Sequence, residues 1–98
     1  MNEMTEEEYV EYLRVERWLY AWCLVTYGNE PPQKASNLAI EFYPYESPGE
    51  IGRGYRFHRE AWHWAMMKIH GPDYSPDQKQ WFETSREYRM MEESLRRR

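Results

Sequence analysis

The stretch that decides the fold is residues 5–28, TEEEYVEYLRVERWLYAWCLVTYG. It opens with a capping box, in which the Thr5 hydroxyl accepts from the Glu8 amide while the Glu8 carboxylate accepts from the Thr5 amide. Three glutamates in the first turn interact favourably with the positive end of the helix dipole. The glycine after Tyr27, followed closely by two prolines, is typical of the end of a helix. The sequence therefore predicts a helix that ends at Tyr27. Its second half, from Trp18, is apolar nearly all round, which predicts the central helix of the core.

The next segment, residues 29–50, is ambiguous. Residues 29–34 have the composition of a loop. In residues 36–43 three apolar side chains alternate with polar or small ones, which suits a strand, but Ser36 is also a good helix cap. Because the sequence offers no second strand for pairing, we predict a short helix here.

A second long helix is predicted from the spacing of apolar residues before His70. The stripe has steps of three and four residues and consists of Ile51, Tyr55, His58, Trp62, Met66 and Ile69. Gly52 and Gly54 oppose a helix, at about 1 kcal/mol each relative to alanine. We give the periodicity more weight, and so predict a helix that begins between Pro48 and Tyr55 and ends at His70.

The third long helix is predicted to begin at Ser75, because Ser75-Pro76-Asp77-Gln78 supplies a capping side chain, a proline and two polar residues in order. Its inward stripe is Trp81, Tyr88, Met91 and Leu95. Amphipathic helices joined by loops predict an all-α fold: a small three-helix bundle with an irregular or short-helical insert between the first and second long helices. A chain of 98 residues has room for one such helical domain, residues 1–98.

The aromatic content indicates a binding function. Five Trp, nine Tyr and three Phe occur in 98 residues, and each ring side chain buries roughly 150–250 Å² of surface. A core this small cannot cover all of them, and exposed aromatic surface is typical of contact with a partner. We therefore expect some rings to be exposed. A symmetric homodimer that covers them is one alternative.

The expected location is the cytoplasm. A single cysteine, Cys23, excludes an intrachain disulfide, which fits a reducing compartment. No window reaches 18 consecutive apolar residues, and the chain begins with acidic residues instead of a basic and apolar leader. We therefore expect neither a membrane partner nor a secretion signal.

Catalytic chemistry has little support in the sequence. Cys23 lies in the apolar half of the first helix, without the activating base that a nucleophile needs. Glu60 and His63 have the spacing at which one helical turn offers a carboxylate and an imidazole to a metal, but only one such step occurs. The sequence contains no phosphate loop and no nucleophile elbow. We therefore expect no enzymatic activity, no metal and no cofactor.

Charge is distributed unevenly along the chain, whose net charge is −4. Residues 1–50 carry ten acids and three bases, whereas residues 51–98 carry seven acids and ten bases. This asymmetry predicts two contact surfaces, and we expect stoichiometric binding of a protein, with inhibition of a protein or nucleoprotein machine as the role. Acid-rich, aromatic-rich domains of this size are often antagonists encoded by mobile elements such as phages. The predicted partner-binding residues are Glu6, Glu7, Glu11, Arg56, Arg59 and Trp64.

Two alternatives to these surfaces stay open. If the second long helix includes residues 53–63, bases alternate there with aromatic rings, which suits phosphates and unpaired nucleobases. A nucleic-acid-binding regulator would then use Arg53, Arg56, Phe57, Arg59 and His63. In the other alternative the arginines pair within the chain with glutamates of the first helix, which fits a chain whose net charge is negative.

Overall fold

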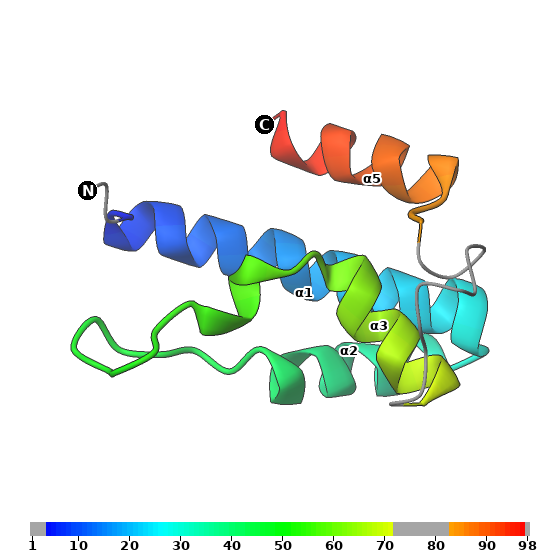
Figure 1. Ribbon diagram of the computed structural model, residues 1–98, viewed down its shortest axis with the longest axis horizontal. Coiled ribbons are helices and arrows are strands. Elements are labelled where there is room, and N and C mark those ends of the chain that lie inside the picture. The colour runs from blue at the N-terminus through cyan, green and yellow to red at the C-terminus, as the bar shows by residue number, and fades with distance from the viewer. Residues whose placement is uncertain (1–3, 72–82, 98) are drawn as a thin grey trace.

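The computed structural model describes residues 4–71 and 83–97 of the chain. Within them the fold is all-helical, as predicted, with the α-helices α1 (Glu6–Gly28), α2 (Pro32–Phe42), α3 (Ala61–His70) and α5 (Arg86–Arg96) and a 3-10 helix at Tyr55–His58. Helix α1 is central, because each of the other three α-helices packs against it. Figure 1 shows α2 returning antiparallel to α1, α3 crossing α1 obliquely, and α5 on the side of α1 opposite α2. The finer description, a three-helix bundle with an insert, is not confirmed.

Both ends of α1 follow from local chemistry. The predicted capping box is present: the Thr5 amide donates to Glu8 Oε1 at 2.9 Å, and the Glu8 amide donates to Thr5 Oγ1 at 3.1 Å. The helix ends at Gly28, one residue later than predicted, where Asn29 takes a left-handed conformation (φ 59°) and its amide donates to the Leu24 carbonyl. A short polar side chain tolerates this conformation, which satisfies a carbonyl of the last turn.

Helix α2 confirms the short helix, but it begins at Pro32, four residues before the predicted cap at Ser36. The loop predicted for residues 29–34 is therefore too long. Proline suits the first helical position because its φ is already helical and the amide it lacks would have no partner there. Ala35 and Ala39 are buried, and small side chains on this face allow α2 to lie close to α1.

The prediction of a second long helix from the region of Pro48 is wrong, because α3 begins only at Ala61. The first residues of the predicted stripe lie outside the core: Ile51 is fully exposed and Tyr55 is 68% exposed. Gly52 and Gly54 take left-handed conformations (φ 82° and 78°), which helical side chains do not adopt. The cost of glycine in a helix outweighed the apolar spacing.

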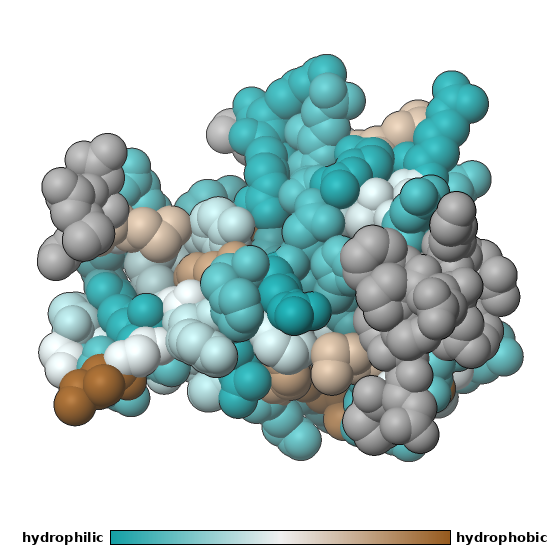
Figure 2. Space-filling view, in the orientation of Figure 1, coloured by the Kyte–Doolittle hydropathy of each residue, from teal (hydrophilic) through white to brown (hydrophobic). Residues whose placement is uncertain are grey.

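The loop before the 3-10 helix is held by its own polar groups. The Glu46 carboxylate accepts from the Gly54 amide, and Arg53 Nε donates to the Glu46 carbonyl, each at 2.9 Å. The Glu50 carboxylate accepts from the Ser47 amide at 2.6 Å, so the contact expected of a helix cap forms without a helix after it. Most of the face shown in Figure 2 is hydrophilic, and its strongly hydrophobic patch at the lower left lies at the tip of this loop.

Two alanine substitutions test this loop conformation. Gly52→Ala should lower the free energy of unfolding by about 1 kcal/mol, because alanine is strained at positive φ. Gly49→Ala is the matched control: Gly49 has no positive φ and an added Cβ meets no atom within 4 Å, so its effect should be near zero or slightly stabilising. Urea unfolding measures both. If the segment were helical instead, both substitutions would stabilise the protein.

Helix α5 begins much later than the predicted third helix. The expected cap at Ser75 and the expected core residue Trp81 lie outside the described residues. Residues 83–85 are not helical, and the hydroxyl of Ser85 accepts from the Tyr88 amide at 3.1 Å as the cap of α5. A helix that is continuous from residue 75 is therefore wrong. The predicted inward positions within α5 are confirmed, because Tyr88 and Leu95 are buried and Met91 packs against the core.

A buried carboxylate joins three helices. Glu16 of α1 is 1% exposed, and its Oε2 accepts from Nη2 of Arg96 in the last turn of α5 at 2.5 Å. The backbone of Ala61, at the start of α3, has a smaller effect that lowers the pKa of this carboxyl. Burial raises the pKa of Glu16 to about 7, against the opposing effect of the Arg96 cation. Glu16 therefore anchors α5 to α1 beside the N-terminus of α3.

Candidate functional site

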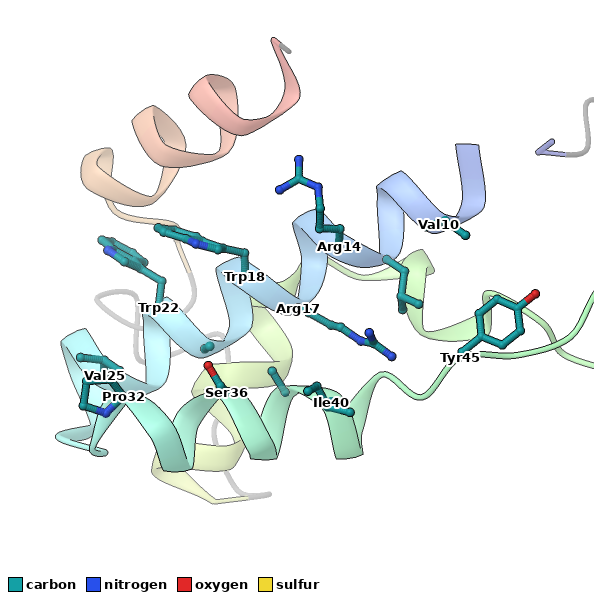
Figure 3. Close-up of a pocket in the computed structure, with 13 residues that line it drawn as sticks. Val10, Arg14, Arg17, Trp18, Trp22, Val25, Pro32, Ser36, Ile40 and Tyr45 are labelled. Atoms are coloured by element: carbon teal, nitrogen blue, oxygen red, sulfur yellow. The ribbon is translucent and has the colours of Figure 1, made fainter. Parts of the chain in front are cut away.

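An open groove runs along α1 and α2, and we call it the α1/α2 groove. Its volume is about 700 Å³. It is lined by Val10, Leu13, Arg14, Arg17, Trp18, Ala21, Trp22 and Val25 of α1, by Pro32, Ser36, Ala39 and Ile40 of α2, and by Tyr45. Figure 3 shows Arg14, Trp18 and Trp22 projecting from one side of α1, Val25 and Pro32 together at one end, and Tyr45 toward the other end.

The local sequence explains why the two helices form walls. On α1, positions 10, 14, 18, 21 and 25 recur at steps of three and four, so they share one face. On α2, positions 32, 36 and 40 do the same. The small side chain of Ala39 is buried between these walls and makes part of the floor. The small side chain of Ala39 thus lies low in the groove, and the larger lining side chains stand on either side of it.

Large apolar side chains stay exposed in this groove. Trp18 is 41% exposed and Ile40 52% exposed, and Val10, Val25 and Tyr45 are exposed as well. The Trp18 indole makes no ring contact or hydrogen bond with the described residues. The expectation that some rings remain exposed is thus confirmed, whereas the second half of α1 is not buried all round. Exposed apolar surface gathered in one concavity is typical of a binding site.

Among the residues that the structure describes, the charged ones that line the groove are two arginines. Arg14 Nη2 pairs with Glu11 Oε2 at 2.7 Å, and both side chains are about half exposed. Arg17 Nε donates to the Tyr43 carbonyl at 2.8 Å, which fixes the guanidinium between α1 and the end of α2. No carboxylate of the residues that the structure describes forms an ion pair with Arg17. The groove therefore combines apolar walls with positive charge.

Comparisons with protein-family models, with curated proteins and with solved structures gave no match.

The predicted acidic contact surface is partly used within the chain. Glu6 accepts from the Tyr45 hydroxyl and from Arg53 Nη2, both at 2.5 Å, and these hydrogen bonds lower the pKa of Glu6, with the larger effect from Tyr45. Glu11 pairs with Arg14. Glu7 is exposed on the first turn of α1. The alternative of intrachain pairing therefore holds for Glu6 and Arg53.

The other predicted contact residues lie apart from the acidic helix start. Trp64 Nε1 donates to the Arg56 carbonyl at 2.9 Å, and the Arg56 guanidinium lies 4.4 Å from the centre of the Phe42 ring. Trp64 also packs against Phe42, with ring centres 5.4 Å apart, so it is only half exposed. Arg59 is exposed in extended backbone just before α3. The structure thus joins Arg56 and Trp64, and these contacts do not involve Glu6, Glu7 or Glu11.

The basic helical face required by the nucleic-acid alternative does not form. Arg56 lies in the 3-10 helix, Arg59 in extended backbone and His63 in α3, so no single helix presents them. The Phe57 ring packs against Tyr12 and Tyr9, with centroid distances of 4.5 and 5.7 Å, and Arg53 is paired with Glu6. Burial lowers the pKa of His63, so its neutral form is favoured.

The residues considered for chemistry are arranged as follows. Cys23 is fully buried, and burial raises the pKa of its thiol, which disfavours the reactive thiolate. His63 Nε2 lies 3.8 Å from Glu60 Oε1. Within residues 4–71 and 83–97, no three His, Cys, Asp or Glu side chains are placed to hold a metal ion. In the same part of the chain no helix combines the length and the apolar character needed to cross a membrane.

The groove was not predicted from the sequence, although one signal for it exists. The core face of α1 is formed by Tyr9, Leu13, Glu16, Tyr20 and Leu24, among others. Val10, Trp18 and Val25 form a second apolar stripe on another face. An apolar stripe beyond the one a core requires is a signal for a contact surface.

Proposed function

We propose that this chain is a protein-binding module that holds a partner protein, one to one, in the α1/α2 groove. The observation that carries the proposal is Trp18: a tryptophan 41% exposed, without a ring partner among the described residues, on the wall of an apolar groove. Tryptophan and arginine are the residue types that most often dominate binding energy at protein interfaces, and both line this groove. Inhibition of the bound protein is the role we propose for such stoichiometric binding.

Site-specific photocrosslinking in cells that express the chain tests this function. A benzophenone amino acid placed at Ile40, in the groove, should give an adduct of one defined mass. The same group at Met90, an exposed apolar position on α5, is the matched control and should give none. Equal adducts at both positions, or none at either, would contradict the proposal. An adduct that nuclease digestion removes would support the nucleic-acid alternative instead.

A further inference from the structure

We infer that the occupant of the α1/α2 groove is an amphipathic α-helix of another protein whose polar flanks are acidic; this inference rests on the proposed function. Three features of the groove determine the occupant: the conformation that its walls accept, its length, and its charge. Each excludes a different class of ligand.

The walls favour a helix over an extended peptide. An extended segment leaves its backbone N–H and C=O groups to be paired by the receptor, usually at the edge of a sheet. The long walls of this groove are the helices α1 and α2, whose backbone groups are paired inside each helix. A helical ligand brings its backbone already paired and needs only an apolar face.

The length of the apolar wall sets the length of the ligand. The lining residues of α1 extend from Val10 to Val25. At about 1.5 Å per residue these fifteen steps span about 22 Å, so a bound helix of roughly fifteen residues, about four turns, would cover the wall. Its apolar residues should recur every three or four positions so that one face meets Trp18 and Ile40.

The charge of the groove selects acidic flanks. Covering Arg17 removes water from a guanidinium that no carboxylate of the described chain pairs with, and burying an unpaired charge is costly. A glutamate or aspartate beside the apolar face of the ligand offsets this cost with a charge-assisted hydrogen bond to the free end of the guanidinium. A ligand with basic flanks would instead meet two arginines of like charge.

The same charges disfavour a second copy of this chain as the occupant. In a twofold-symmetric pair each groove would cover its own equivalent. Arg17 of both copies would then lie in one seam, and no carboxylate of the described residues pairs with it, whereas Arg14 already pairs with Glu11. A homodimer formed through this surface is therefore an outcome for the test and not the expectation.

A displayed peptide library tests the inference on the full chain. The library holds 18-residue helical peptides with a fixed Leu/Ile stripe, in which the flanking positions vary among Glu, Gln and Lys. Selection against the wild-type protein should enrich Glu at the flanks, and the enriched peptide should bind the Arg17→Glu variant at least tenfold more weakly, as measured by fluorescence anisotropy. Selection against Arg17→Glu should enrich Lys. Arg17→Gln keeps a donor for the Tyr43 carbonyl, so it serves as the second variant if charge reversal disturbs folding. It should weaken binding of the enriched peptide less than Arg17→Glu does.

Lys34→Glu is the matched control, because it changes the net charge equally at an exposed cation of α2 outside the groove. An equal loss for Lys34→Glu, enrichment without acidic bias, or no enrichment would overturn the inference. A dimer in sedimentation that Ile40→Asp dissociates would also overturn it, in favour of a second copy. The proposed function is tested separately: an adduct at Ile40 together with a failed selection would leave the function standing with a different occupant.

Discussion

Replacing Arg96 with methionine should lower the free energy of unfolding by about 2 kcal/mol at pH 8 and by less than about 1 kcal/mol at pH 5. At pH 8 the substitution removes the cation that now pairs with the buried Glu16 carboxylate, so Glu16 must either stay charged without a partner or take up a proton from a basic solution, and both cost free energy. At pH 5 Glu16 can take up a proton instead. Burial already raises its pKa to about 7 in the intact protein, and the loss of Arg96 removes the charge that opposes this shift.

The sign of the pH dependence follows from that direction. A carboxyl whose pKa is higher in the folded chain than its unfolded value of about 4.5 binds a proton more readily when folded, so protonation stabilises the fold as the pH falls. The extra cost of the Arg96→Met substitution therefore grows as the pH rises above about 7, where Glu16 of the intact protein loses its proton, and it is relieved below that pH. Urea unfolding at a series of pH values between 5 and 8 measures this slope.

Two further variants separate the buried pair from general effects. Arg97→Met removes an exposed cation whose ion pair with Glu93 is solvated, so it should cost less than about 0.5 kcal/mol at either pH. Combining Glu16→Leu with Arg96→Met removes both charges and should recover most of the stability, since no unpaired charge remains. An Arg96→Met variant that behaves like Arg97→Met at both pH values would show that Glu16 does not depend on Arg96.

The parts of the fold that could be predicted from the sequence are those fixed by neighbouring residues. The Thr5–Glu8 capping box and the glycine stop each depend on groups a few positions apart, and both lie within one residue of their predicted places. The start of α3 could not be found in this way. Apolar spacing and glycine cost opposed each other there, and the loop also uses Arg53 to reach Glu6, which is distant in sequence. Such a contact exists only once the chain has folded.

The sequence could predict that aromatic residues would be exposed, but not where on the fold they would form a binding groove. The surplus of aromatic residues correctly predicts exposed rings, and Trp18 is one of them. Its location depends on which faces of α1 the other helices cover, and α2, α3 and α5 each cover a part. The sequence of α1 alone does not show which face the other helices cover, because two of its faces carry apolar stripes. Tertiary packing decides which stripe stays exposed. Arg56 and Arg59 would lie on one helix only if the longer predicted helix formed, and they lie outside α3.

Truncation of two neighbouring residues of α1 should lower the free energy of unfolding by very different amounts. Leu19→Ala should lower the free energy of unfolding by about 3 kcal/mol, because Leu19 is fully buried and its loss leaves a cavity under the other helices. Trp18→Ala should cost about 1 kcal/mol or less, since the indole is 41% exposed and lies on the wall of the groove. Thermal and urea unfolding measure both values.

Binding should show the reverse order. Trp18→Ala should weaken binding of the selected acidic helical peptide at least about 30-fold, which corresponds to about 2 kcal/mol and is typical of a central aromatic residue at an interface. Leu19→Ala, measured well below its unfolding temperature, should change this affinity less than about threefold, because Leu19 does not line the groove. Equal affinity losses for the two variants would mean that binding follows fold stability. A loss confined to Trp18→Ala would mean that the exposed indole is kept for a partner, since the fold itself gains little from it.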